Sequence, residues 1–202
     1  MRNLFKTLAL AMPLAMASPL FAQDSETPTE QPGAATPVDP GISMGEEATD
    51  DKVGETYIKQ SFEDWHMRCV HAPEGQEDPC QLYQLLNDET GNPVAEISIF
   101  TLPESAGAAA GATIVTPLET LLTQQVRLSV DSNPAKRYPF SWCSAAGCFA
   151  RIGFTPEEIS GFKRGAKAKL TIVPVVAPDQ TVDLTLSLKG FTAGYDALVA
   201  SN

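Results

Sequence analysis

Four cysteines are the residues of this sequence best suited to chemistry, and they lie as two local pairs, Cys69 with Cys80 and Cys143 with Cys148. Such thiols can form disulfides, a redox-active dithiol or a metal site. Four cysteines permit three disulfide pairings, and the sequence alone does not choose among them, although we favour the two local ones. Redox-active dithiols usually have C-x-x-C spacing, which neither pair has. We therefore expect disulfides rather than redox or zinc chemistry.

Other side chains suited to catalysis are few. The two histidines, His66 and His71, would point to opposite faces of a strand, so they do not form a natural chelate. Neither lies in a motif such as G-x-S-x-G. Glu157 and Glu158 follow a threonine and a proline, and capping of a helix explains them. The sequence therefore predicts no catalytic residue, no metal site and no cofactor.

Five other residues form a possible binding surface. Tyr138, Phe140 and Trp142 are spaced by two and would share one face of a strand; we expect core packing, and a sugar-stacking platform is the alternative. Lys163 and Arg164 begin the one basic cluster of an acidic chain, which continues with two more lysines. These cations are expected to complete a helix C-terminus, and the alternative is docking of an anionic glycan, a lipid phosphate or the chain's own acidic tail.

The elements that must position these residues are mostly strands. Residues 126–130 and 182–189 alternate between apolar and polar side chains with the period of a half-buried strand. Turn signals such as those at 88–93 and 131–134 separate the strands. Eight short strands predict one mainly β domain, a β-sandwich or a related barrel. The six other strands are expected around residues 65–71, 81–86, 94–102, 138–143, 148–154 and 168–176.

Two short helices and a loop complete the prediction. Thr155, Pro156 and Glu158 form a capping box that starts a helix over 156–164. A second helix is expected over 192–199, docked on the sandwich. The Gly/Ala-rich residues 105–111 lack bulk and periodicity, which predicts a mobile surface loop.

Composition divides the chain into three parts. Residues 1–22, with a basic start and an apolar stretch, are predicted to be a signal peptide. Residues 23–51 have four prolines, eight acidic residues and no basic one, which is typical of a disordered linker. Residues 52–202 then form the β-sandwich domain, with 12 basic and 17 acidic residues.

The predicted signal peptide indicates that the protein is exported. Beyond the predicted signal peptide no run of about 18 apolar residues could serve as a transmembrane anchor. Residues 52–202 have a net charge of −5 and residues 23–51 one of −8, which disfavours non-specific binding to nucleic acid or anionic lipid. We expect a periplasmic or secreted protein, in a compartment where disulfides persist.

Several short motifs, taken in order, resemble the invasion-associated locus B family over about residues 61–198. The resemblance implies an exported alphaproteobacterial protein with a compact β-sandwich-like domain and no established enzymatic activity; the founding member is associated with entry of a pathogen into red blood cells. This chain has Glu119 and Gln125 where the family commonly has glycine, so the loop before residues 126–130 is expected to be reshaped. The motifs are Asp64-Trp65, Cys69, Cys80 with Gln84, Thr116-Pro117-Leu118, Pro139-Phe140, Cys143, Gly147-Cys148 and Ser187-Leu-Lys-Gly-Phe191.

The function expected from these observations is interaction rather than catalysis. We predict a non-enzymatic protein that binds an envelope or extracellular partner, either a protein or a glycan, through loops around the disulfide-linked hairpin. The alternative is a small-molecule or glycan binding module that uses Trp142 and its neighbours in a concave site. An enzyme, which would need a histidine beside a carboxylate or hydroxyl, is the third choice.

Overall fold

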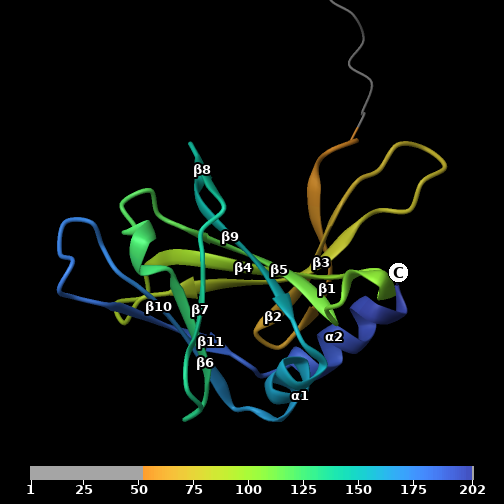
Figure 1. Cartoon of the computed structure of the whole chain (residues 1–202). Helices are drawn as coiled ribbons and strands as arrows, with labels where there is room; N and C mark the ends of the chain where they lie inside the picture. Colours follow the sequence, from red (N-terminus) through yellow and green to blue (C-terminus); the bar gives the residue numbers. More distant parts are fainter. Residues whose placement is uncertain (1–51, 202) are drawn as a thin grey trace, which may run out of the picture. The chain divides into compact units, whose positions relative to one another are not determined.

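The computed structural model describes residues 52–201 and shows two antiparallel β-sheets facing each other (Figure 1). The predicted signal peptide and acidic linker lie outside these residues. The larger sheet has the order β1-β2-β3-β4-β5-β9-β8 and the smaller one the order β11-β10-β6-β7. This architecture confirms the predicted sandwich-like, mainly β fold. The strands are β1 Thr56–Phe62, β2 Trp65–Val70, β3 Cys80–Asn87, β4 Pro93–Thr101, β5 Ala110–Thr116, β6 Val126–Val130, β7 Lys136–Tyr138, β8 Trp142–Ser144, β9 Gly147–Phe154, β10 Lys167–Ile172 and β11 Val182–Ser187.

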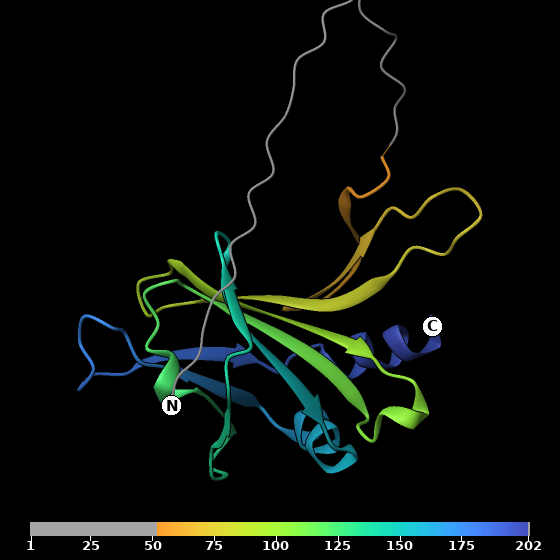
Figure 2. The same cartoon turned by 45° about the horizontal axis from the view of Figure 1, so that its top comes forward.

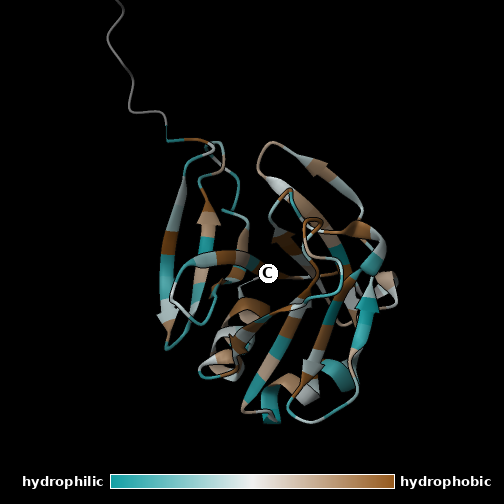
Figure 3. Cartoon of the chain, turned by 90° about the vertical axis from the view of Figure 1, so that its left-hand side faces the viewer, coloured by the Kyte–Doolittle hydropathy of each residue, from teal (hydrophilic) through white to brown (hydrophobic). Residues whose placement is uncertain are grey.

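Apolar residues alternate with polar ones along most strands (Figure 3). Because successive side chains of a strand point to opposite faces, the apolar ones gather between the two sheets and form the core. In β2, for example, Trp65, Met67 and Cys69 are buried and the residues between them are partly exposed. The same alternation buries Leu184 and Leu186 in β11. The predicted period-two patterns therefore identified the inner faces of the sheets.

Two helices close one side of the sandwich. Helix α1, Pro156–Arg164, begins with the predicted capping box, in which the Thr155 hydroxyl accepts from the Glu158 N–H and the Glu158 carboxylate accepts from the Thr155 N–H. Helix α2, Phe191–Ala200, packs against β1 to β4 and against α1. Aromatic contacts among Phe154, Phe162 and Phe191 join the helices to the core. Both helices were predicted. Short 3₁₀ turns lie at Glu104–Ala106 and Leu122–Gln124.

The structure corrects the prediction in the region of the Gly/Ala-rich segment. Its last residues, Ala110 and Gly111, belong to β5, an internal strand of the larger sheet, rather than to a surface loop. The ring of Phe100, the cross-strand partner of Gly111, occupies the space that a side chain at Gly111 would need. Small residues are therefore a packing requirement at this position. Strand β1 was also not predicted, because its side chains are mostly exposed.

A second correction concerns the aromatic run predicted as one strand over residues 138–143. The chain leaves the smaller sheet after Tyr138, the end of β7, and enters the larger sheet at Trp142, the start of β8. Residues of one strand share a face, whereas residues on either side of a crossing do not. The three aromatic residues therefore lie in different surroundings.

Within residues 52–201, no helix is long and apolar enough to cross a bilayer.

Candidate interaction surface

The two disulfides are the local ones, Cys69–Cys80 and Cys143–Cys148. In each, the cysteines are direct cross-strand partners, between β2 and β3 and between β8 and β9. The β2–β3 loop and the β8–β9 hairpin rise on the same side of the molecule, from opposite ends of the larger sheet (Figure 2). The disulfides thus brace both ends of that sheet. None of the four thiols is free for redox chemistry or metal binding.

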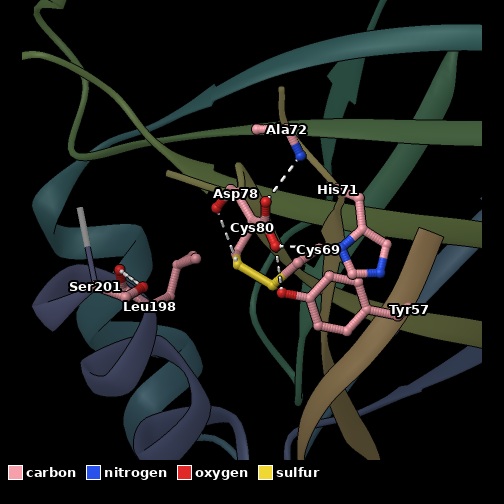
Figure 4. The surroundings of a disulfide bond; sticks show 8 residues. All are labelled: Tyr57, Cys69, His71, Ala72, Asp78, Cys80, Leu198 and Ser201. Atoms are coloured by element: carbon pink, nitrogen blue, oxygen red, sulfur yellow. Dashed lines mark hydrogen bonds and ion pairs between the residues drawn. A yellow bond between two sulfur atoms is a disulfide. The ribbon is translucent and has the colours of Figure 1, made fainter. Parts of the chain in front are cut away.

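Asp78 organises the loop beside the first disulfide (Figure 4). Its carboxylate accepts from the Tyr57 hydroxyl at 2.7 Å and from the Ala72 N–H at 2.8 Å, and lies 3.6 Å from Nδ1 of His71. The His71 ring stacks on Tyr57 with centroids 4.4 Å apart. The Ala72 and Tyr57 hydrogen bonds lower the pKa of Asp78, although desolvation opposes them. These contacts hold the loop in one conformation.

The structure leaves the histidines with separate structural partners. His66 forms a hydrogen bond of 3.0 Å between Nδ1 and the Ser61 hydroxyl, while His71 belongs to the Asp78 cluster. No group of three or more histidine, cysteine, aspartate or glutamate residues among those described is arranged to hold a metal ion.

Three of the motifs that carry the family resemblance, those of Asp64-Trp65, Gln84 and Ser187, meet where the two sheets join. The main-chain carbonyl of Ser187, at the end of β11, accepts from Trp65 Nε1 at 2.9 Å and from Gln84 Nε2 at 3.1 Å. Gln84 Oε1 accepts from the Ser187 N–H at 2.8 Å, and Asp64 accepts from the Ser187 hydroxyl at 2.6 Å. Gly190, three residues on, has φ 80°, and a side chain there would collide with the Phe62 carbonyl. These motifs therefore specify the fold and do not form a ligand site.

The predicted binding surface is divided among three places. Trp142 is 47% exposed, against the expectation of core packing, and its ring stacks on Phe149 with centroids 5.1 Å apart. Phe140 is half-buried against the core. Tyr138 lies beside α1, whose last turn carries Lys163 and Arg164. The structure therefore does not bring these residues together as one site.

Tyr138 belongs to a small polar cluster at the start of α1. Its hydroxyl donates to Glu158 Oε1 at 2.9 Å, and Lys136 Nζ lies 2.7 Å from the same oxygen. Burial and this hydrogen bond raise the pKa of Tyr138. Burial also raises the pKa of Glu158, but the hydrogen bonds from Lys136, Thr155 and Tyr138 outweigh it and the pKa is lowered. The cluster is a closed set of partners in a cleft of about 220 Å³.

The basic cluster is also mostly satisfied within the protein. Lys163 Nζ lies 2.6 Å from Asp196 and 5.0 Å from the centre of the Tyr195 ring. Lys169 Nζ lies 2.9 Å from Asp183 on the neighbouring strand. Arg164 is exposed. These contacts agree with the expectation that the cations complete a helix end and cover a strand.

Trp142 instead belongs to a row that crosses the outward face of the larger sheet. Leu85, Glu96, Val115, Phe149 and Trp142 are successive cross-strand partners from β3 through β4, β5 and β9 to β8. All five alternate with buried residues or lie on the exposed hairpin, so they face away from the core. Four of the five are apolar, and we call this set the outward row.

Four residues of the outward row, all except Trp142, line a shallow groove. The groove has a volume of about 530 Å³ and is walled by Val94, Pro117 and Ala146 in addition to residues of the row. Leu85 is 45% exposed and Leu118, next to Pro117, is 56% exposed. Exposed apolar side chains that are contiguous, rather than scattered, mark sites of association.

A polar row lies beside the outward row and gives the surface charge and hydrogen-bonding groups. Arg68 lies 3.9 Å from the centre of the Tyr83 ring, donates to the Ser98 hydroxyl at 3.1 Å and pairs with Glu96 at 3.7 Å. These contacts fix the Arg68 guanidinium and the Tyr83 ring against the sheet. A rigid mixture of apolar, aromatic and arginine side chains is the composition favoured at protein interfaces.

Sequence reasoning missed most of the outward row. Leu85, Val115 and Phe149 lie far apart in the chain, and only strand register makes them neighbours. Phe149 directly follows Cys148, and its alternation with the buried Cys148 and Ala150 would have placed it on the opposite face from the core. The sequence therefore contained a signal for the orientation of Phe149. It contained none for the pairing of β5 with β9, which places Phe149 beside Val115.

Comparisons with known proteins were consistent with one another. Residues 65–199 match the family described as Invasion associated locus B (IalB) protein. Two proteins named "Invasion protein B homolog", from Brucella abortus strain 2308 and from Brucella abortus biovar 1 strain 9-941, are each 23% identical over 147 residues, or 73% of this chain and 82% of the relative. The crystal structure of invasion associated protein b from Bartonella henselae superimposes with a TM-score of 0.58 at 22% identity, covering 70% of this chain and 95% of that one. The last match supports the fold.

Proposed function

The chain belongs to the invasion associated locus B family, and on this premise we propose that it is an exported, non-enzymatic protein that binds a protein partner in the cell envelope or outside the cell. The single observation that carries the proposal is the outward row, in which apolar side chains on four of five neighbouring strands face solvent. The braced hairpins at the two ends of the sheet keep this face preorganised, so binding orders few side chains.

Three features support export. The N-terminal residues have the composition of a signal peptide. Both pairs of cysteines are oxidised, which is the state favoured outside the cytoplasm. The names of the Brucella and Bartonella relatives refer to invasion, a process at the cell surface. Contact with a host cell, as a further step, rests on those names alone.

The non-enzymatic part of the proposal rests on the surroundings of the polar groups. His66 contacts a serine hydroxyl on an exposed hairpin, and His71 is stacked against Tyr57. Glu158 caps a helix and pairs with Lys136. Each of these groups has a structural task.

The test is crosslinking and pull-down from intact cells and purified envelope with the mature protein. The variant Leu85→Thr/Trp142→Thr removes two exposed apolar side chains of the outward row. The matched control Val176→Thr/Val199→Thr removes two exposed apolar side chains elsewhere, in the β10–β11 loop and on α2. We expect the wild type and the control to retain one protein partner and the row variant to lose it about tenfold or more, as at interface hot spots.

Circular dichroism and thermal unfolding would establish that both variants are folded. Equal recovery of the partner by the row variant and the control would refute the outward row as the binding face. Recovery of glycans or small ligands alone, dependent on Trp142, would refute a protein partner and favour a binding module.

A further inference from the structure

The smaller sheet carries an unusual set of charges on its strands. Its outward side presents Arg127 from β6, Arg137 from β7, Lys167 and Lys169 from β10, and one carboxylate, Asp183 from β11. The domain as a whole has more acidic than basic residues. Cations are therefore gathered on this face in a protein that elsewhere carries an excess of negative charge.

Arg127 and Arg137 are direct cross-strand partners. Opposed residues of an antiparallel pair have Cβ atoms about 5 Å apart, and like charges in that position destabilise the pair. Within residues 52–201 no carboxylate forms an ion pair with either guanidinium. Asp183, the carboxylate of this face, already binds Lys169 and the Thr171 hydroxyl. The two arginines thus repel each other, and Asp183 attracts Arg127 only from beyond ion-pair distance.

Arg127 adds a second observation. Its Nε is buried, and among the described residues it finds no hydrogen-bond acceptor. Leaving a buried donor without a partner is unfavourable, so most such donors in proteins are paired. The next strand places the Thr171 hydroxyl directly opposite Arg127, but that hydroxyl is used by Asp183. The Nε donor is therefore left without a partner, while the Arg127 side chain as a whole is partly exposed.

We propose that Arg127 and Arg137 form a binding site for a phosphate or sulfate group. A tetrahedral oxoanion has enough oxygens to accept from two guanidiniums at once and a charge that offsets both, whereas a carboxylate has only two oxygens and one charge. Lys167 on the next strand adds positive potential on the same face, whereas Lys169 is paired with Asp183. This site is separate from the outward row, because it lies on the other sheet.

The oxoanion can come from the free ion or from a lipid headgroup, and two probes separate these sources. The first is inorganic phosphate, titrated calorimetrically into the full mature chain at low ionic strength. The second is sedimentation with vesicles of phosphatidylcholine containing phosphatidylglycerol. The variant is Arg127→Gln/Arg137→Gln, and Arg137→Gln alone serves as a second variant because Arg137 is exposed and its loss does not disturb the core.

The matched control is Lys59→Gln/Arg151→Gln, which changes the net charge equally at two exposed cations of the larger sheet. We expect the wild type and the control to bind at least one probe and the double arginine variant to bind it about tenfold or more weakly, the loss expected when charge-assisted hydrogen bonds are removed. Binding of phosphate identifies the free ion as sufficient, and binding of vesicles alone identifies the headgroup. Failure of the wild type to bind either probe, or equal weakening in the control, overturns the proposal.

Discussion

Gln125 has a backbone conformation that residues with a side chain rarely adopt. Its φ of 58° and ψ of 163° lie in a region that is nearly exclusive to glycine and costs other residues about 1–3 kcal/mol. The residue ends a 3₁₀ turn, where its N–H donates to the Leu122 carbonyl, and starts the path into β6. Glycine is what the family resemblance expects here, and the conformation that this chain adopts is one that glycine adopts without strain.

Replacing Gln125 with glycine is therefore predicted to stabilise the protein. Relief of the strain outweighs the greater freedom that glycine gives the unfolded chain, and we expect the free energy of unfolding to rise by about 1 kcal/mol. Urea denaturation of both proteins measures the change. Gln124→Gly, one residue earlier within the 3₁₀ turn, is the control and should lower stability. A Gln125→Gly protein less stable than the wild type would contradict the strain argument.

At the scale of an element, the β2–β3 loop depends on one carboxylate. Asp78 accepts from Ala72 at one end of the loop and from Tyr57 in the neighbouring strand. These hydrogen bonds, the backbone one first, keep the pKa of Asp78 below its ordinary value of 3.8. A carboxyl group with a lowered pKa stabilises the folded state above its unfolded pKa, and that contribution is lost as the pH falls through the folded pKa.

The loop is therefore predicted to loosen at a pH below about 4. Hydrogen exchange of the Ala72 amide, followed by NMR, should show protection at pH 6 that declines as the pH is lowered. In Asp78→Asn the protection should be weak at both ends of this range, because the amide cannot replace the charged acceptor. Glu74→Gln, which removes an exposed carboxylate of the same loop, should keep the wild-type profile. An unchanged profile in Asp78→Asn would show that other contacts hold the loop.

The strands and helices that were predicted correctly are those whose structure leaves a pattern in the local sequence. Strands with one buried face, such as β6 and β11, were predicted from their alternation because burial imposes it. The edge strand β1 buries little and so carries no such pattern. In β5, the ring of Phe100 occupies the space that a side chain at position 111 would need, so a glycine lies there. This contact is between strands, and the local sequence gives no sign of it. The capping box of α1 is wholly local, which is why its start was predicted to the residue.

At the scale of the whole molecule, the two sheets are joined through Ser187. Its N–H and carbonyl are bound by Gln84, which is buried, and the carbonyl also accepts from Trp65. The motif residues Asp64, Trp65, Gln84 and Ser187 were recognised in the sequence, but their shared role was not, since they come together only in the folded chain.

Gln84→Met tests this joint. The change keeps the length of the side chain and leaves the partly buried Ser187 N–H without an acceptor, so the free energy of unfolding should fall by about 1–2 kcal/mol. Gln81→Met, at an exposed position of the same strand, should change it by less than about 0.5 kcal/mol. Thermal and urea unfolding of both variants provide the comparison. Equal, small effects would mean that the sheets are held by apolar packing alone.

The candidate surface was less predictable than the fold. Of the five residues predicted, Trp142 lies on the outward row. Tyr138 and Phe140 lie elsewhere because the chain changes sheets before Trp142, and Lys163 and Arg164 end helix α1. Composition identified the aromatic residues, whereas the register of β3, β4, β5, β9 and β8 decides which of them are neighbours.

The placement of the disulfides also has a consequence for how the chain folds. They close loops of 11 and 5 residues within hairpins, while the contact of Trp65 with Ser187 joins residues 122 apart. Bringing Trp65 and Ser187 together costs about 2 kcal/mol more in chain entropy than closing the loop between Cys69 and Cys80. Oxidation can therefore follow hairpin formation directly and precede the joining of the sheets. Each hairpin brings its own two thiols together, so the native pairing is reached without reshuffling of bonds formed between distant cysteines.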